Sequence, residues 1–242
     1  MLLLVSVTNA AEASAAIAGG ADIVDAKDPG AGALGAVSRD AMRAIHAVAG
    51  ERPTTAALGE AASERAVERD ADTFVRLGAR LVKVGFAGIT APERVESLLV
   101  AAMRGAGAVS HRAGGVIAVA YADADRVGSA PPPVVMAAAA RAGASGVLLD
   151  TADKGGPSLA ALVSPDALTR WVAEGHAAGL LVAVAGKVSD ADVDWLRATG
   201  ADVMGVRGSA CEGGRMGLIS TSRVRVLRAL CAADRRHVLL PA

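Results

Sequence analysis

Short apolar runs that recur eight times along the chain are the feature that most constrains its fold. The runs are rich in Val, Ile and Leu and mostly lack polar alternation, as expected for parallel strands that are covered on both faces. They occupy residues 2–7, 22–26, 54–58, 81–84, 116–121, 146–150, 180–185 and 202–206. We therefore expect a parallel sheet that is buried inside the molecule.

Alanine-rich segments with helical periodicity follow the apolar runs. They cover residues 10–18, 39–48, 64–77, 92–103, 134–142, 165–178, 190–198 and 222–232. Several begin at helix-start signals, such as Ser164 before Pro165 and Ser189 before Asp190. Several also end at a glycine that can adopt the left-handed conformation just before the next strand. The pattern predicts eight strand-helix units.

Eight such units in 242 residues match a TIM barrel, whose typical length is about 250 residues. An open doubly wound sheet would usually have fewer units. No stretch rich in proline, serine or charge divides the chain into parts. We predict an α/β fold of the (β/α)8 TIM-barrel type, with a single domain over residues 1–242.

Composition excludes several classes of function. Hydrophobic residues make up 52% of the chain, enough for a large core and too many for a disordered protein. The 25 acidic and 25 basic residues cancel, and aromatic residues make up only 2%, so neither a nucleic acid nor a membrane is an expected partner. No run of 18 apolar residues occurs. We expect a cytoplasmic protein, and a homo-oligomer is compatible with the sequence.

Lysine is scarce, and its positions are informative. The chain has four lysines against 21 arginines, and each lysine lies at or just past the end of an apolar run. They are Lys27, Lys83, Lys154 and Lys187. One loop lysine alone would usually be a solvated charge, but in a TIM barrel all four would meet at the rim that carries the reacting groups. Cations gathered there lower one another's pKa and favour a neutral, nucleophilic amine.

Two aspartates accompany these lysines. Asp25 is two residues before Lys27, so both side chains are expected on the same side of the second strand. Asp150 ends the sixth strand, and Lys154 follows four residues later. We expect the carboxylates to orient the amines and relay protons. The set favours an enzyme that forms a Schiff base with, or enolises, an anionic carbonyl compound.

Glycine-rich segments follow the seventh and eighth runs, where TIM barrels commonly hold phosphate. Backbone N–H groups and a cation are available in each segment. The predicted phosphate ligands are Gly186, Lys187, Arg207, Gly208 and Ser209. The alternative is that these glycines only form tight turns.

Other cofactor motifs are weak. Residues 30–35 match the dinucleotide pattern G-x-G-x-x-G literally, but Ser38 is the expected helix cap and the preceding strand is the second of the series. Cys211 and Cys231 lack the spacing of a metal knuckle. The histidines have no i, i+4 pair; they are His46, His111, His176 and His237. We expect no nucleotide and no metal at these positions.

Several segments carry a resemblance to a known family. They are Leu3-Leu4-Val5-Ser6-Val7, Gly19-Gly20-Ala21-Asp22-Ile23-Val24-Asp25-Ala26-Lys27-Asp28-Pro29, Leu81-Val82-Lys83-Val84-Gly85, Ala120-Tyr121-Ala122-Asp123 and Leu148-Leu149-Asp150-Thr151-Ala152-Asp153-Lys154. At these residues the chain resembles the (5-formylfuran-3-yl)methyl phosphate synthases. These enzymes begin furan assembly for methanofuran in methanogens and for methylofuran in methylotrophic bacteria.

The resemblance implies a TIM-barrel lyase that condenses two molecules of glyceraldehyde 3-phosphate into (5-formylfuran-3-yl)methyl phosphate, without metal or organic cofactor. It implies that Lys27 forms the Schiff base and that Lys83 accepts a proton, with Asp25, Asp150 and Lys154 as further active-site residues. A phosphorylated triose is then the expected small-molecule partner. Two alternatives remain open: a class I aldolase or isomerase acting on triose phosphates, and a non-catalytic barrel that binds phosphosugars.

Overall fold

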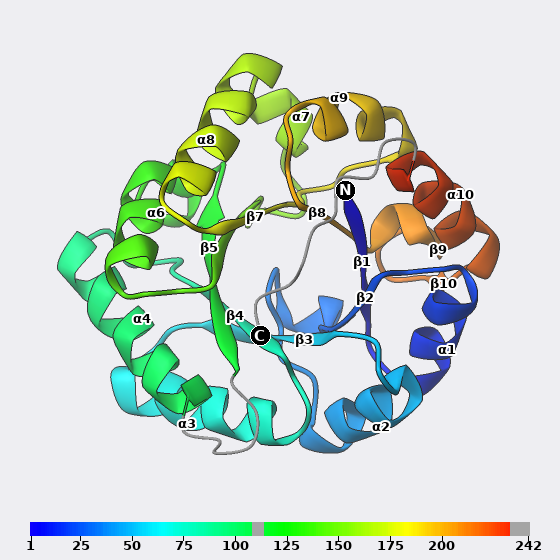
Figure 1. Cartoon of the computed structure of the whole chain (residues 1–242), viewed down its shortest axis with the longest axis horizontal. Helices are drawn as coiled ribbons and strands as arrows, with labels where there is room; N and C mark the ends of the chain where they lie inside the picture. The colour runs from blue at the N-terminus through cyan, green and yellow to red at the C-terminus, as the bar shows by residue number, and fades with distance from the viewer. Residues whose placement is uncertain (108–113, 233–242) are drawn as a thin grey trace.

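The computed structural model describes residues 1–107 and 114–232, which form a closed barrel of eight parallel strands surrounded by helices (Figure 1). Each strand pairs with the next one in the chain, and β8 pairs with β1 to close the barrel. The strands are β1 Leu2–Val7, β2 Ile23–Ala26, β3 Thr54–Glu60, β4 Leu81–Gly85, β5 Gly115–Tyr121, β6 Gly146–Asp150, β7 Leu181–Val184 and β8 Val203–Val206. The predicted TIM barrel is confirmed, while His111 and His237 lie outside the described residues.

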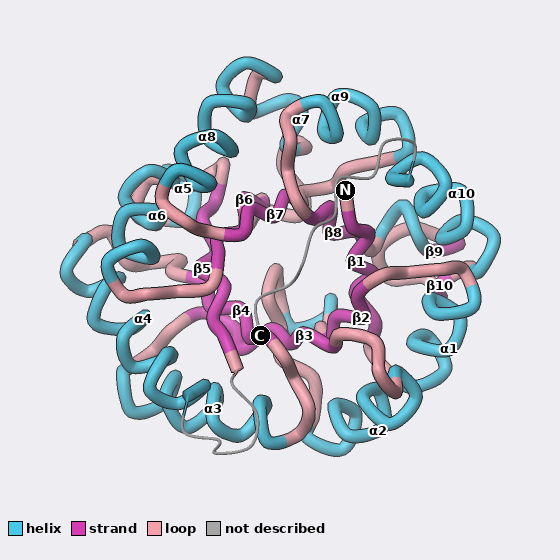
Figure 2. The backbone as a smooth tube through the Cα atoms, viewed as in Figure 1, coloured by secondary structure: helices cyan, strands magenta, loops and turns pink. Residues whose placement is uncertain are grey.

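The helices form an outer ring around the strands (Figure 2). The longer ones are α1 Ala10–Ala18, α2 Arg39–Ala49, α3 Glu64–Arg76, α4 Pro92–Gly107, α6 Pro132–Arg141, α8 Pro165–Ala177, α9 Val193–Ala198 and α10 Thr221–Ala232. Side-chain caps mark several of their starts: the Ser38 hydroxyl accepts a hydrogen bond from the amide of Ala41, and Ser164 accepts one from that of Ala167. In the described part of the chain, no helix is long and apolar enough to cross a lipid bilayer.

One predicted helix was wrong in its detail. The segment 190–198 begins as a tight 3-10 turn, η2 Asp190–Asp192, and becomes α-helical only in α9. The Asp192 carboxylate accepts hydrogen bonds from both the amide and the hydroxyl of Ser189 at 2.8 Å. This reciprocal cap closes the first turn more tightly than an α-helix would.

Short elements in the loops after the strands were not predicted. They are η1 Pro29–Ala31, α5 Ala124–Val127, α7 Leu159–Leu162, η3 Gly208–Ala210 and the hairpin of β9 Cys211–Glu212 with β10 Leu218–Ile219. None is longer than four residues, so hydrophobic periodicity has too few positions to reveal them. All follow a barrel strand and therefore lie near the carboxyl ends of the strands.

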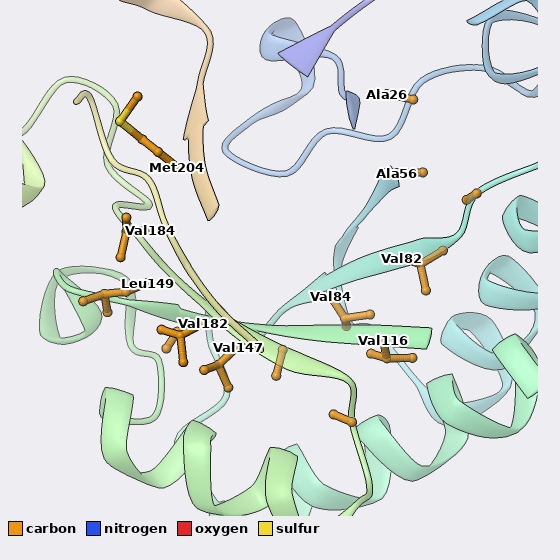
Figure 3. Close-up of a cluster of buried hydrophobic side chains, with 14 of the residues drawn as sticks. Ala26, Ala56, Val82, Val84, Val116, Val147, Leu149, Val182, Val184 and Met204 are labelled. Atoms are coloured by element: carbon orange, nitrogen blue, oxygen red, sulfur yellow. The ribbon is translucent and has the colours of Figure 1, made fainter. Parts of the chain in front are cut away.

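The strands are mostly apolar because both of their faces are buried. Outward-pointing side chains such as Val82, Val84, Val147 and Val184 pack against the helices (Figure 3). Inward-pointing side chains form a second, smaller cluster inside the barrel. That inner cluster includes Leu4, Ile23, Leu81, Ile117, Leu148 and Val203. The inward positions nearer the carboxyl ends carry polar groups instead, which sets the place of the site.

Close packing of α3 against α4 gives a test of the fold. A Cβ atom added at Gly105 would lie 2.1 Å from the backbone oxygen of Glu68, so the two helices would have to separate. We expect Gly105→Ala to lower the free energy of unfolding by about 1–3 kcal/mol. Gly107→Ala is the matched control, because its added Cβ meets nothing within 4 Å among the described residues. Urea denaturation should show a loss only for Gly105→Ala, and equal effects would contradict this packing.

Candidate active site

A cavity of about 370 Å³ opens at the carboxyl ends of the strands and continues into the barrel. We call it the central cavity. Every site residue predicted from the sequence lines it except Asp25; the lining includes Lys27, Lys83, Asp150, Lys154, Gly186, Lys187, Arg207, Gly208 and Ser209. Its volume is within the range of small-molecule sites. The eight-unit pattern thus places these side chains around one space.

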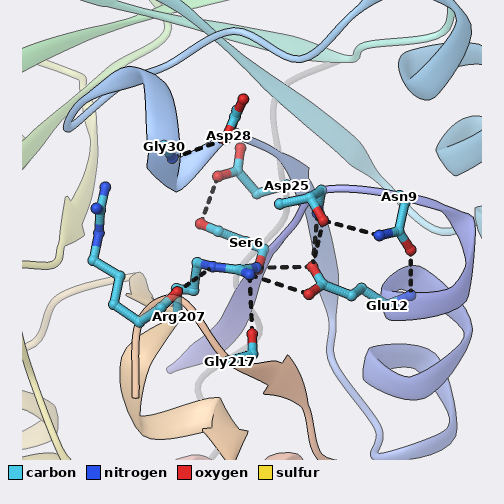
Figure 4. Close-up of polar contacts among 10 residues, drawn as sticks. Ser6, Asn9, Glu12, Asp25, Asp28, Gly30, Arg207 and Gly217 are labelled. Carbon is cyan, nitrogen blue, oxygen red and sulfur yellow. Dashed lines mark hydrogen bonds and ion pairs between the residues drawn. The ribbon is translucent and has the colours of Figure 1, made fainter. Parts of the chain in front are cut away.

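Asp25 lies beneath the cavity and is fully buried on β2. Its carboxylate accepts hydrogen bonds from the Ser6 hydroxyl at 2.8 Å (Figure 4) and from the Thr55 hydroxyl at 2.7 Å. Lys83 Nζ lies 2.6 Å from Asp25 Oδ2. Burial raises the pKa of Asp25, but the charges of Lys83 and Lys27 and the hydrogen bonds from Lys83 and Thr55 outweigh it, so the pKa falls below its usual value. Asp25 is therefore a buried carboxylate anion.

Asp150, at the end of β6, forms a second buried ion pair. Lys154 Nζ lies 2.9 Å from Asp150 Oδ1 and also donates to the Thr151 carbonyl. The amide of Thr151 donates to the same carboxylate at 2.7 Å. Burial raises the pKa of Asp150, yet Lys154 and Lys27 lower it more, and the net pKa is below the usual range. The expected contact between Lys154 and a carboxylate is present.

Lys27 lies among these two ion pairs and is only 9% exposed. Its amine has no hydrogen-bond or ion-pair partner within residues 1–107 and 114–232. Burial and the Lys83 charge lower the pKa of Lys27 to about 8, against the opposing effect of Asp150 and Asp25. Roughly a tenth of the amine is then neutral at pH 7, against fewer than about one in a thousand for an ordinary lysine. Lys27 is thus prepared to act as a nucleophile.

The sequence predicts that Asp25 and its near neighbour Lys27 lie on the same side of the second strand, with the carboxylate orienting a lysine amine. The carboxylate pairs with Lys83, which lies two strands away on β4. Thr55 on β3 lies opposite Asp25 in the strand register and fills the gap between the two strands with its hydroxyl. Lys27 feels the Asp25 charge without forming an ion pair with it.

The loop after β7 has an unusual backbone. Gly186 has a φ of 108°, and Lys187 follows at 59°, the one non-glycine residue with positive φ in the described chain. A Cβ at Gly186 would lie 3.2 Å from the Thr151 amide, so a larger residue would press on the β6 loop. The Lys187 side chain is exposed and donates to the Gly156 carbonyl. The ammonium group and the curled backbone both lie at the wall of the central cavity.

Ser209 follows β8, the strand next to β7, and lines the same cavity. Its hydroxyl oxygen is buried and has no hydrogen-bond partner among the residues that the structure describes. A buried hydroxyl without a partner is costly, and a bound ligand would satisfy it. Ser209 and the β7 loop together could hold a phosphate group.

Arg207 has a different role from the phosphate contact expected from the sequence. Its guanidinium donates to both carboxylate oxygens of Glu12 on α1, at 2.8 and 3.1 Å, and to the carbonyls of Ser6, Arg215 and Gly217 (Figure 4). Each of its nitrogens therefore already has a protein acceptor, and Glu12 balances its charge. Arg207 anchors the loop after β8.

The sequence does not assign a role to Asp123 or Tyr121, and the structure shows which residues each of them contacts. Asp123 accepts hydrogen bonds from the amides of Ala152 and Asp153, both at 2.8 Å, and so holds the loop that carries Lys154. The Tyr121 hydroxyl donates to Glu60 at 2.5 Å. A Cβ at Gly85 would lie 2.4 Å from that hydroxyl, so only glycine permits this contact. Burial and nearby carboxylates raise the pKa of Tyr121, which keeps it a hydrogen-bond donor.

Sequence reasoning missed four residues of the site: Ser6, Thr55, Glu12 and Arg215. Ser6 and Thr55 could have been found from the sequence, because each carries a hydroxyl at an inward position of a predicted strand. Arg215 had none, since it lies in the hairpin loop between β9 and β10 and reaches the cavity only through the path of that loop. No group of three or more His, Cys, Asp or Glu side chains that could hold a metal occurs in the described ranges.

Comparisons with known proteins show the family of the chain. A family model described as 4-HFC-P synthase matches residues 3–228. The (5-formylfuran-3-yl)methyl phosphate synthase of Methanocaldococcus jannaschii is 36% identical over 235 residues, which cover 96% of this chain and 100% of the relative. The protein of the same name from Methanopyrus kandleri is 37% identical over 229 residues, covering 93% and 96%.

The crystal structure of 3-hexulose-6-phosphate synthase from Salmonella typhimurium has the same fold, with a TM-score of 0.68 and 17% identity over 96% of this chain and 99% of that one. This structural similarity supports only the barrel fold, whereas the sequence relatives and the family model show the family. The chain belongs to the (5-formylfuran-3-yl)methyl phosphate synthase family.

Proposed function

We propose that this protein condenses two molecules of glyceraldehyde 3-phosphate into (5-formylfuran-3-yl)methyl phosphate through a Schiff base on Lys27, as an early step of methylofuran or methanofuran biosynthesis. The observation that carries the proposal is the buried, unpartnered amine of Lys27 between two lysine-aspartate ion pairs. Membership of the family supports (5-formylfuran-3-yl)methyl phosphate as the product. The neutral fraction of the Lys27 amine supports a mechanism through a Schiff base.

The first triose phosphate would lose its carbonyl oxygen as water when the Lys27 amine adds and forms an iminium. Lys83 can supply the proton that this water needs, because its ammonium group is fixed 2.6 Å from Asp25 and lines the cavity. Once neutral, the Lys83 amine can accept the proton from the carbon beside the iminium. Asp25 stays anionic throughout and stabilises the protonated form of Lys83.

The enamine formed in this way would attack the aldehyde carbon of the second triose. Cyclisation frees the Lys27 amine, and the net loss of two molecules of water and one of inorganic phosphate from the two trioses leaves the aromatic furan. Lys154 and Asp150, on the opposite side of Lys27, would exchange protons with the departing oxygens. Lys187, Gly186, Gly208 and Ser209 would hold a substrate phosphate, with Arg207 fixing the loop after β8 rather than touching the anion.

Two other functions would use parts of the same site. A class I aldolase or isomerase would form the same adduct but no product that absorbs in the near ultraviolet. A non-catalytic phosphosugar-binding barrel would bind triose phosphate without turnover. The low pKa of Lys27 is of no use to a binding protein and so favours an enzyme.

Borohydride trapping tests the covalent step. With glyceraldehyde 3-phosphate and borohydride, we expect a reduced adduct on the peptide that contains Lys27, detected by mass spectrometry. Lys27→Ala should form no adduct and should lose furan production by on the order of 10³-fold or more, since the covalent route is closed. An adduct on another lysine, or full activity of Lys27→Ala, would refute the assignment.

The pH dependence of trapping tests the state of Lys27. Only the neutral amine adds to a carbonyl, so below pH 8 the trapping rate should fall by about tenfold per pH unit, and above pH 8 it should level off. Lys83→Met removes a cation that lowers the pKa of Lys27, so the curve should move to higher pH. Asp150→Asn removes an anion that raises it, and the curve should move to lower pH. Shifts in one common direction would contradict this electrostatic account.

A further inference from the structure

Arg215 reaches across the rim of the cavity from the loop between β9 and β10. Its Nη1 donates to the Pro29 carbonyl at 2.8 Å and its Nη2 to the Gly32 carbonyl at 2.7 Å, both in the loop after β2. The side chain is half-buried and lines the central cavity. Arg207 fixes the backbone of the loop between β9 and β10 by donating hydrogen bonds to the Arg215 and Gly217 carbonyls. The guanidinium is therefore fixed in place without any ligand.

Charge balance around the cavity singles out this residue. Three of the surrounding cations have carboxylate partners: Lys83 with Asp25, Lys154 with Asp150, and Arg207 with Glu12. In the described part of the chain, Arg215 and Lys187 have no carboxylate oxygen within 4 Å. Carbonyl groups satisfy hydrogen bonds but do not cancel a charge. Apart from Lys27, whose amine is assigned to the covalent step, two cations thus remain without a counter-ion, in two different loops.

The two uncompensated cations differ in their surroundings: the Lys187 side chain is exposed and that of Arg215 is half-buried. The space near Lys187 includes the buried Ser209 hydroxyl, which lacks a partner, and the buried Gly186. Arg215 lies on a hairpin whose neighbouring residues Met216 and Leu218 are 68% and 74% exposed. A guanidinium has five N–H donors, and Arg215 uses two of its terminal groups on the β2 loop, so it retains donors for an anion.

From this arrangement we infer that Arg215 binds the phosphate of the second triose, the acceptor that the Lys27 enamine attacks. The space beside Lys187, which contains the unpartnered Ser209 hydroxyl, then holds the phosphate of the triose bound to Lys27, which must be in place first. Burial lowers the pKa of the Arg215 guanidinium, in keeping with a site that becomes more favourable when an anion enters. This inference rests on the proposed condensation, since it assigns a residue to its second substrate.

Two measurements on the same protein separate the two phosphates. Borohydride trapping on Lys27 needs one triose, and furan formation, followed by its near-ultraviolet absorbance, needs two. In Arg215→Gln, trapping should keep the wild-type half-saturating concentration of glyceraldehyde 3-phosphate, whereas furan formation should need at least about tenfold more substrate. In Lys187→Gln, the half-saturation of trapping itself should rise. Arg225→Gln, an exposed arginine of α10, is the matched control and should change neither.

Arg215 also ties two loops together, so binding must be separated from folding. Arg215→Ala should have the thermal unfolding midpoint of Arg215→Gln, and added guanidinium chloride at low concentration should restore part of its furan formation. Rescue of the half-saturating concentration supports an anion contact, whereas an equal shift of trapping and furan formation, or no shift of either, overturns the inference. If wild-type protein gives neither adduct nor furan, the proposed function itself has failed, a result distinct from a failure confined to Arg215.

Discussion

The buried carboxylate of Asp25 is the constraint on which the rest of the site depends. An anion inside a barrel lined by Leu and Ile is costly unless hydrogen bonds and an opposite charge satisfy it. Ser6 on β1, Thr55 on β3 and Lys83 on β4 supply these contacts, so one carboxylate on β2 connects four neighbouring strands. Any slip in strand register would leave it unsatisfied. The same requirement fixes the Lys83 ammonium group, whose charge lowers the pKa of Lys27. The strand register that pairs Asp25 with Lys83 therefore also helps to set the pKa of Lys27.

A second network links the outer ring to the rim. Glu12 on α1 pairs with Arg207, and Arg207 in turn holds the hairpin backbone through two carbonyls. Glu12 also accepts a hydrogen bond from the amide of Thr8, and its pKa is low because the contacts to Arg207 and Thr8 outweigh the effect of burial. Arg215 then extends from that hairpin to the loop after β2. The loops after β8, β1 and β2 are therefore held as one unit, although each is too short to form a core of its own.

Much of this architecture could be predicted from the sequence, for reasons visible in particular residues. Continuous apolar runs identify parallel strands, and the place of Lys27 and Asp150 at run ends locates them at the rim. The partner of Asp25 could not be found in this way, because contact with Lys83 depends on register across three strands rather than on spacing along one. The prediction that Arg207 binds phosphate rested on the glycines around it, which resemble those of a phosphate-binding loop. Only the folded structure brings Glu12 next to Arg207 and shows that the guanidinium already donates to a carboxylate. Arg215 has no local signal at all.

The inner layer of the barrel argues that its charges are retained for chemistry rather than stability. Toward the amino ends of the strands the inward positions are filled by Leu4, Ile23, Leu81 and Ile117, which pack with no polar cost. Extending that aliphatic layer to the carboxyl ends would be neutral or stabilising, because a buried ion pair often contributes less than well-packed apolar side chains of similar volume. The chain instead places Asp25, Lys83 and Asp150 there. Departures from a consistent packing rule are expected at functional sites. Here the departure has a specific effect: the same burial that makes these charges costly lowers the pKa of Lys27 and frees its amine to react.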